Sequence, residues 1–403
     1  MKWNISIGFA ALCVGGLVAC SAADPGSSSL AASAGGDNGR ALGSPGGGVS
    51  TDTQPRGGAG EGTSGAGGTS SGGDTTSGET SGAGGTSGGS APTGGSTVTG
   101  TSPVLGGCAI YPADNPWNRD VSADPVDTDA MARVMPNMLP TTALHPDWGL
   151  RSDGDGIPFT VVSGGAKLPM SFVASWGPSE SDPLAGCSGS RFCYPIPENA
   201  LIEGGPSAPS DADRHVLVLD TTGAPNNCTL YELYHAFPNG AGWTADNGAI
   251  FHLGSDALRT DGWTSADAAG LPVLPGLVRY DEAMSGEIKH AIRFTMHSTF
   301  NGYIHPATHA AGLSNSAEPA MGLRMRLKAG VDISKFKGPM LAVVKAMKKY
   351  GIILADNGSN WYITGESNDA WASQMDAVVS QMRLLHGSDF EIVKSGTVST
   401  KGL

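Results

Sequence analysis

Residues 215–220 read His-Val-Leu-Val-Leu-Asp, a run whose four central positions are all apolar. Side chains of a β-strand point alternately to opposite faces of a sheet, so this strand would be apolar on both faces. Such a strand belongs at the centre of a fold, covered from both sides. The turn-forming segment Gly223-Ala-Pro-Asn-Asn227 leads into a second β-type run, 229–237. The pair predicts a core antiparallel hairpin.

Short β-type runs separated by turn residues recur on both sides of this hairpin. They favour a mainly β fold, an antiparallel β-sandwich of the jelly-roll kind with a few peripheral helices. The runs are 157–162, 169–173, 249–253, 288–296, 323–328, 352–355 and 361–364.

Two amphipathic helices are expected near the C-terminus. The first begins near Pro339, carries apolar residues at helical spacing and ends at Gly351. The second begins at a capping residue, Asn368 or Asp369, and ends at Gly387. Their methionine and tryptophan stripes predict contacts with the core of the domain.

The N-terminus has the features of an export signal. An apolar run from Ile5 to Ala19 is shorter than the roughly twenty residues that a membrane-spanning helix needs. Its end, Leu17-Val-Ala-Cys20, resembles the lipobox of bacterial lipoproteins, which is cut before the cysteine that carries the lipid. Residues 1–19 are therefore predicted to be a signal peptide and Cys20 a lipidation site. The alternative is an ordinary secretory signal with a chance cysteine.

The resemblance to lipoproteins also implies a location. Ser21, rather than an aspartate, follows the anchor, which implies outer-membrane attachment with exposure to the periplasm or the cell surface. Contact with the bilayer is expected through the acylated Cys20 alone.

The segment after the anchor is predicted to be a disordered tether over residues 20–102. Residues 21–102 contain 26 glycines and no aromatic residue, so they cannot bury enough apolar surface to offset the entropy of ordering. As a Gly-rich coil the tether would reach roughly 50 Å. Residues 103–403 suit a single globular domain in length.

Charge and cysteines narrow the class of protein further. The net charge of −13 argues against nucleic acid as a partner. Four cysteines in an oxidising compartment predict two disulfides, although three pairings are open. Cys187 and Cys193 enclose a short local loop, which would leave Cys108 to pair with Cys228. A metal site is the alternative, but no Cys-x-x-Cys pair occurs.

Basic residues gather on alternating positions of two predicted strands. If those faces line one groove, they could bind a carboxylated or sulfated sugar polymer, since arginine offers bidentate contacts. The alternative is the solvent-facing side of an antiparallel sheet. The residues are Arg324, Arg326 and Lys328 on one strand and Lys289 and Arg293 on the other.

Metal binding receives little support from the sequence. His305 and His309 have i, i+4 spacing, but zinc needs a third ligand and no glutamate follows His305. A structural calcium ion is a candidate at two aspartate groups, neither of which completes a twelve-residue calcium loop. Turn formation explains these aspartates equally well. The groups are Asp153 with Asp155 and Asp211 with Asp213. No cofactor is predicted.

Carboxylates near predicted strand ends could form a glycosidase pair, which requires two of them across a sugar. Asp213-Arg-His215 places an acid, a cation and a titratable ring at the start of the central strand. Glu232 lies on the partner strand. The alternative is a salt-bridged structural cluster. The carboxylates are Glu203, Asp213, Asp220, Glu232, Asp246, Asp267, Asp281 and Glu282.

Other chemistries lack their motifs. Within the predicted domain, residues 103–403, no Gly-x-Ser-x-Gly turn, phosphate loop or dinucleotide fingerprint occurs. Tryptophans such as Trp243 suit either sugar stacking or core filling.

Several blocks resemble a group of secreted bacterial proteins. They are Asp114-Asn-Pro-Trp-Asn118, Asp213-Arg-His215, 262–270, 274–281 and 355–361. The resemblance covers most of 103–393, implies that this span is one unit, and implies no particular reaction. A short helix capped by Thr264 or Ser265 is an additional expectation. The candidate catalytic residues are Asp213, His215, Glu232, Asp267, Arg279, His290, Arg293 and His309, with Trp243, Arg324, Arg326 and Asp356 as substrate-binding candidates.

These features predict a surface-anchored carbohydrate-active protein that degrades a polysaccharide or cell-surface glycan. A lyase would use Arg293 or Arg279 to neutralise a uronate and His290 or His215 as the base. A hydrolase would use Glu232 and Asp213. The alternative is a non-catalytic protein that binds a glycan or a protein partner.

Overall fold

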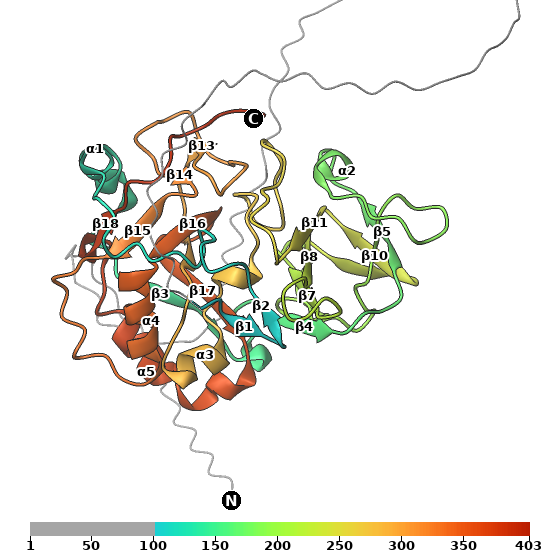
Figure 1. The fold of residues 1–403 in the computed structure, drawn as a ribbon, viewed down its shortest axis with the longest axis horizontal. Helices are drawn as coiled ribbons and strands as arrows, with labels where there is room; N and C mark the ends of the chain where they lie inside the picture. Colours follow the sequence, from blue (N-terminus) through green and yellow to red (C-terminus); the bar gives the residue numbers. More distant parts are fainter. Residues whose placement is uncertain (1–100) are drawn as a thin grey trace, which may run out of the picture. The chain divides into compact units, whose positions relative to one another are not determined.

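The computed structural model describes residues 101–403, and the fold over this range is mainly β (Figure 1). The predicted signal peptide, Cys20 and nearly all of the tether lie outside the described residues. Within 101–403, none of the helices combines the length and the hydropathy needed to cross a membrane.

A four-stranded sheet with the order β11-β8-β7-β4 contains the predicted hairpin. In β7, Leu217 and Leu219 enter one hydrophobic core, whereas Val216 and Val218 enter another. The central strand is therefore buried on both faces, as predicted, and β7 pairs antiparallel with β8. The strands are β4 (Phe159–Val162), β7 (Val216–Asp220), β8 (Thr229–Tyr234) and β11 (Asn247–His252).

The smaller core lies between this sheet and a second four-stranded sheet with the order β6-β5-β10-β9. Met170 and Phe172 of β5 and Trp243 of β10 meet Val216 and Val218 there. The strands are β5 (Leu168–Phe172), β6 (Cys193–Tyr194), β9 (Phe237–Asn239) and β10 (Gly242–Ala245).

The larger core joins the other face of the β7 sheet to a six-stranded sheet with the order β18-β15-β16-β12-β17-β3. Helix α4 contacts β15, α3 and α5 (Figure 1). The strands are β3 (His145–Gly149), β12 (Ile292–Met296), β15 (Arg324–Leu327), β16 (Ile352–Asn357), β17 (Tyr362–Ser367) and β18 (Phe390–Ile392). The helices are α3 (Tyr280–Ser285), α4 (Pro339–Lys349) and α5 (Met375–Met382).

Short elements complete the described part of the chain. They are β1 (Val104–Leu105), β2 (Cys108–Ala109), β13 (Phe300–Tyr303), β14 (Ala320–Met321), α1 (Thr128–Arg133) and α2 (Gly177–Glu180).

The sheets are mixed, which corrects the expectation of purely antiparallel pairing. β12 pairs parallel with β16, β17 with β3, and β4 with β7. Parallel partners are joined by long connections rather than by tight turns, so local turn residues do not reveal them. β3, for example, precedes its partner β17 by about two hundred residues. The jelly-roll-like arrangement of the sheets stays a prediction.

Both C-terminal helices are present, with one difference in extent. α4 begins at Pro339, and Gly351 follows it with φ of 78°, a conformation that suits glycine. The Asn368 side chain accepts a hydrogen bond from the backbone N–H of Ala370, which confirms it as a cap. That cap begins a 3₁₀ turn, and α5 then ends at Met382, before the predicted stop at Gly387. The expected helix after Ser265 is a turn instead.

The two disulfides join Cys108 to Cys228 and Cys187 to Cys193. This confirms the predicted pairing. The first bridge ties the start of the domain to the loop before β8, across a sequence separation of 120 residues. The second closes a local loop with a separation of 6.

The two bridges should differ in their contribution to stability, because a longer loop loses more entropy on closure. We expect replacement of Cys108 and Cys228 by alanine to lower the free energy of unfolding by about 4–5 kcal/mol. Replacement of Cys187 and Cys193 should cost about 2 kcal/mol. Denaturant unfolding of both double variants measures the difference, and equal losses would contradict the loop-length explanation.

Candidate functional site

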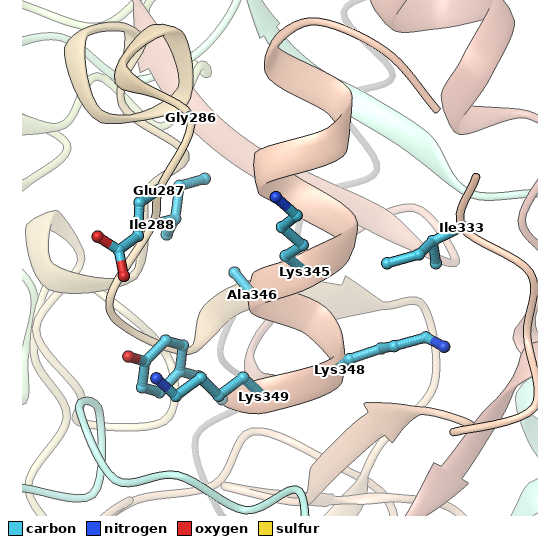
Figure 2. Close-up of a pocket in the computed structure, with 9 residues that line it drawn as sticks. Gly286, Glu287, Ile288, Ile333, Lys345, Ala346, Lys348 and Lys349 are labelled. Atoms are coloured by element: carbon cyan, nitrogen blue, oxygen red, sulfur yellow. The ribbon is translucent and has the colours of Figure 1, made fainter. Parts of the chain in front are cut away.

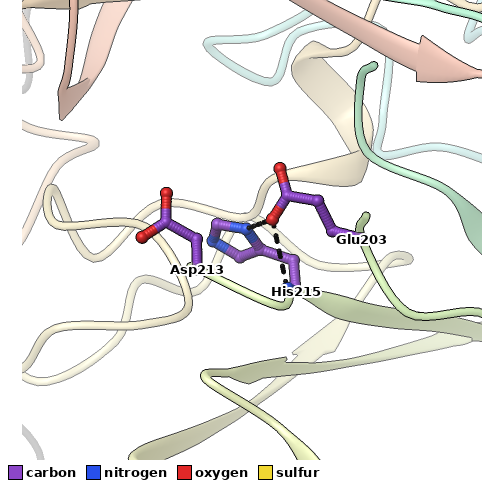
Figure 3. A group of neighbouring side chains, drawn as sticks. All are labelled: Glu203, Asp213 and His215. Carbon is purple, nitrogen blue, oxygen red and sulfur yellow. Dashed lines mark hydrogen bonds and ion pairs between the residues drawn. The ribbon is translucent and has the colours of Figure 1, made fainter. Parts of the chain in front are cut away.

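His215 lies at the start of β7, on the side of the strand that faces the larger core. Its Nδ1 is 2.6 Å from Oε2 of Glu203 (Figure 3). Its Nε2 is 2.8 Å from the carbonyl oxygen of Ala266. Burial lowers the pKa of His215, but the Glu203 carboxylate, together with Asp213 and Asp356, outweighs burial and raises this pKa to about 10. Both ring nitrogens therefore donate a hydrogen bond, and the ring is a buried imidazolium.

Glu203 and Asp213 form a carboxylate pair beside this ring. The ligand-type atoms of Glu203, Asp213 and His215 all lie within 4.8 Å of one another. Burial raises the pKa of Glu203, but the charge and hydrogen bonds of His215 lower it more, so the net shift is downward. Burial and Glu203 raise the pKa of Asp213, against an opposing effect of His215. The pKa values of the two carboxyl groups are thus shifted in opposite directions.

Arg214 turns away from the pair. Its backbone is in the left-handed region at φ of 49°, which is uncommon for residues other than glycine. Its buried guanidinium donates hydrogen bonds to the carbonyls of Ala236 and Ala208, at 3.1 and 2.7 Å. The expected grouping of acid, cation and ring therefore holds for Asp213 and His215 but not for Arg214.

Arg293 of β12 brings two more carboxylates to the site. Its guanidinium contacts both oxygens of Asp267, with Nη2 at 2.6 Å and Nε at 3.3 Å. The same Nη2 lies 3.6 Å from Oδ2 of Asp356. Burial and the neighbouring Asp267 raise the pKa of Asp356 well above its usual range. Asp267 is fully buried, whereas the Asp356 side chain is 22% exposed.

Asp147 of β3 extends the group along one face of the six-stranded sheet. Thr364 of β17 pairs with Asp147, and the register of β17 with β12 places Arg293 beside Thr364. Paired residues share a face, so Arg293 and Asp147 point to the same side. Asp147 is exposed, yet the surrounding protein and Glu203 raise its pKa.

We call this group the His215 cluster. It consists of Asp147, Glu203, Asp213, His215, Asp267, Arg293 and Asp356. Two sheets and the loop around Ala266 contribute to it. Solvent reaches the cluster, because Asp147 and Asp213 are exposed.

Glu232 is excluded from contact with a ligand by its burial. Its side chain is fully buried, and its two oxygens accept the backbone N–H groups of Val273 and Leu274 at 3.0 Å. Burial raises the pKa of Glu232 to about 7. The residue anchors the chain segment after Leu271.

Arg279 and His290 form a separate group around Glu282. Arg279 Nη2 lies 2.7 Å from one carboxylate oxygen of Glu282, and His290 Nε2 lies 2.8 Å from the other. Arg279 and His290 are both buried, so this group fastens α3 to the start of β12. His309 binds the carbonyl of Ala268 at 2.8 Å and braces the loop that carries Asp267.

The basic stripe and Trp243 are also occupied inside the protein. Arg324 donates hydrogen bonds to the carbonyls of Tyr350, Pro116 and Arg119. Arg326 contacts Glu391 at 2.7 Å and the carbonyls of Val121 and Asp124. The segment 116–124 therefore covers this face of β15, so the expected groove is not found there. Trp243 lies in the smaller core, 1% exposed.

A metal ion at Glu203, Asp213 and His215 would need a ring nitrogen with a free lone pair. Both ring nitrogens of His215 face oxygen acceptors, so a cation would first have to displace the Nδ1 proton. Asp213 belongs to this group, whereas its calcium partner in the sequence hypothesis, Asp211, does not. The structural calcium ion stays a prediction.

A cavity of about 410 Å³ lies elsewhere in the described residues (Figure 2). It is lined by Lys345, Lys348 and Lys349 of α4 and by Glu287, Ile333 and Tyr350 among others. It contains no residue of the His215 cluster. Lys348 is engaged there by the carbonyls of Ala329 and Val331.

The sequence hypotheses gave little weight to two residues of the cluster. Glu203 appears in the sequence only as one of many carboxylates, and Asp147 follows no motif. Comparison of the chain with family models, with curated proteins and with solved structures finds no match.

The burial of Glu232 gives a test of its structural role. Native Glu232 keeps its proton up to a pKa of about 7, whereas the unfolded chain releases it near 4.5. The free energy of unfolding should therefore fall as pH rises through this window. In Glu232→Gln, we expect the free energy of unfolding to decrease by up to about 3 kcal/mol less over this pH range than in the parent.

Thermal unfolding at about pH 5 and about pH 8 measures the effect. The exposed Glu198→Gln serves as the matched control and should retain the pH dependence of the parent. Identical pH dependence in the parent and in Glu232→Gln would contradict this role.

Proposed function

We propose that the protein is a carbohydrate-active enzyme that hydrolyses glycosidic bonds in a polysaccharide or cell-surface glycan. The observation that supports this most directly is the pair of carboxyl groups on Glu203 and Asp213. They lie close together and reach solvent, and their surroundings shift their pKa values in opposite directions. Paired carboxyl groups with divided roles are what glycoside hydrolysis requires.

Each residue of the pair has a role that follows from its surroundings. Asp213, whose pKa is raised, would donate its proton to the leaving glycosidic oxygen. Glu203, held ionised by His215, would form a bond to the anomeric carbon as the leaving group departs. Water, deprotonated by Asp213, would then displace Glu203 and release the sugar.

The distance between the two groups favours retention of configuration at the anomeric carbon. Retaining enzymes place their carboxyl groups about 5 Å apart, whereas inverting enzymes need a wider gap for water. The oxygens of Glu203 and Asp213 approach within 4.8 Å. This spacing suits a direct nucleophile better than a water molecule between the carboxylates.

The surroundings of His215 argue against the lyase. A lyase base must accept the C5 proton, but both ring nitrogens of His215 already donate hydrogen bonds. Arg293 would have to neutralise a uronate, but Asp267 already binds it through two contacts. The hydrolase is therefore the reaction that these residues favour.

The remaining sequence expectations belong to the same proposal. They are a lipid anchor at Cys20, a location at the outer membrane, a jelly-roll-like arrangement of the sheets and no role for nucleic acid. A non-catalytic glycan-binding protein is the outcome if binding occurs without turnover.

Two substitutions test the catalytic pair. We expect Glu203→Gln and Asp213→Asn each to lower kcat/KM on a cleaved glycan by about a hundredfold to ten-thousandfold, because each removes a group that takes part in bond cleavage. NMR of the first product should show retained anomeric configuration. Glu198→Gln and Asp211→Asn, at exposed positions near the pair in the sequence, are the matched controls and should keep the activity of the parent. Full activity in either pair variant would overturn the assignment.

His215 is a positioning residue with its own signature in the pH profile. Its charge lowers the pKa of Glu203 and, in part, that of Asp213. We expect His215→Gln to move both limbs of the pH dependence of kcat/KM to higher pH, by about one to three units on the Glu203 limb. A lower rate with unmoved limbs would show that the ring acts through packing alone.

A further inference from the structure

We infer that the His215 cluster selects glycans with protonated amino groups and rejects glycans rich in uronic acids. This inference rests on the proposed function, and it names the substrate class for the same site. A cationic substrate is the opposite of the anionic one that the basic residues of the two predicted strands suggest. The charges that face the cluster carry the inference.

The two cations of the cluster are already paired. Arg293 holds Asp267 through two nitrogens, at 2.6 and 3.3 Å. His215 holds Glu203 at 2.6 Å. A uronate carboxylate entering here would have to displace Asp267 or Glu203 from its cation, which leaves the charge of the displaced carboxylate uncompensated.

Three carboxylates of the cluster have weaker compensation. Among residues 101–403, neither Asp147 nor Asp213 forms an ion pair with a basic side chain. Asp356 shares Arg293 with Asp267 and lies farther from it, at 3.6 Å. An ammonium group would find oxygen acceptors in Asp147 and Asp356 and would favour their ionised forms, while Asp213 keeps its proton for the leaving group. Another anion would add to the repulsion that already raises the pKa values of these carboxyl groups.

The histidine beside Asp147 adds no positive charge, and Arg293, the cation on the same face of the sheet, is already paired with Asp267. His145 precedes Asp147 by two residues on the same face of β3 and stacks on Tyr362 at 4.3 Å. Burial and Arg383 lower the pKa of His145, so the ring is neutral at neutral pH. The net charge of −13 on the chain acts in the same direction, because it attracts a polycation from a distance.

The experiment compares the same sugar chain with charged amino groups and with uncharged, acetylated ones. Oligomers of glucosamine, their fully N-acetylated forms and oligouronates are offered to the full chain at about pH 6, where the free amines are protonated. We expect kcat/KM for the amino form to exceed that for the N-acetylated form by about tenfold, with no cleavage of the uronates. Added salt should reduce this preference.

A variant that removes the charge of Asp147 tests whether the preference for amino substrates arises in the His215 cluster. Asp147→Asn should bring the ratio between amino and N-acetylated substrates down by several-fold. Asp376→Asn, an exposed carboxylate on α5, removes the same charge elsewhere and should leave the ratio unchanged. An equal fall in both variants would assign the preference to overall charge and overturn the role of the cluster.

The outcomes separate this inference from the proposed function. Cleavage of N-acetylated or uronate oligomers at an equal or higher rate overturns the inference and leaves the hydrolase in place. Calorimetric binding of the amino oligomers without turnover supports the charge selection and contradicts the hydrolase. No binding or cleavage of any of the three classes contradicts both.

Discussion

The burial of β7 on both faces is the constraint on which the rest of the structure depends. Leu217 and Leu219 enter one core, and Val216 and Val218 enter the other. Truncation of such side chains costs about 2–5 kcal/mol for leucine, so the four buried positions 216–219 of the strand tolerate no polar residue. Its polar neighbours are consequently placed at its ends, and His215 stands at the end that faces the six-stranded sheet.

This placement explains why the charged groups meet at one location. His215 leaves β7 on the side of the larger core, where β12 and β16 supply Arg293 and Asp356. Charges in such surroundings are stable only when they are paired and hydrogen-bonded. The contacts of His215 with Glu203 and Ala266, and of Arg293 with Asp267, meet that condition. Asp147 and Asp213 reach solvent, and the part of the cost that remains appears as their raised pKa values.

The sequence predicts the strands of this fold well and the site less completely. The apolar run of 215–220, the limits of α4 and the cap at Asn368 are local patterns, and the structure confirms them. Asp213, His215, Asp267, Arg293 and Asp356 were identified as candidates and lie together. Asp147 depends on the parallel pairing of β3 with β17, and Glu203 depends on the course of the loop before β7, and no local pattern predicts either. For Arg324 and Arg326 the sequence predicts a binding groove that the structure does not contain. The alternating pattern of their strand cannot reveal that the segment 116–124 covers its basic face.

The bridge between Cys108 and Cys228 has a mechanical consequence. A pull on the chain ahead of residue 101 reaches Cys108 almost at once and passes through the sulfurs to the loop before β8. The short strand β1, which precedes Cys108, peels away first, and the load then falls on the most deeply embedded hairpin of the molecule. Force applied at this end would then have to shear the centre of the β7 sheet before it could unravel the remaining edge.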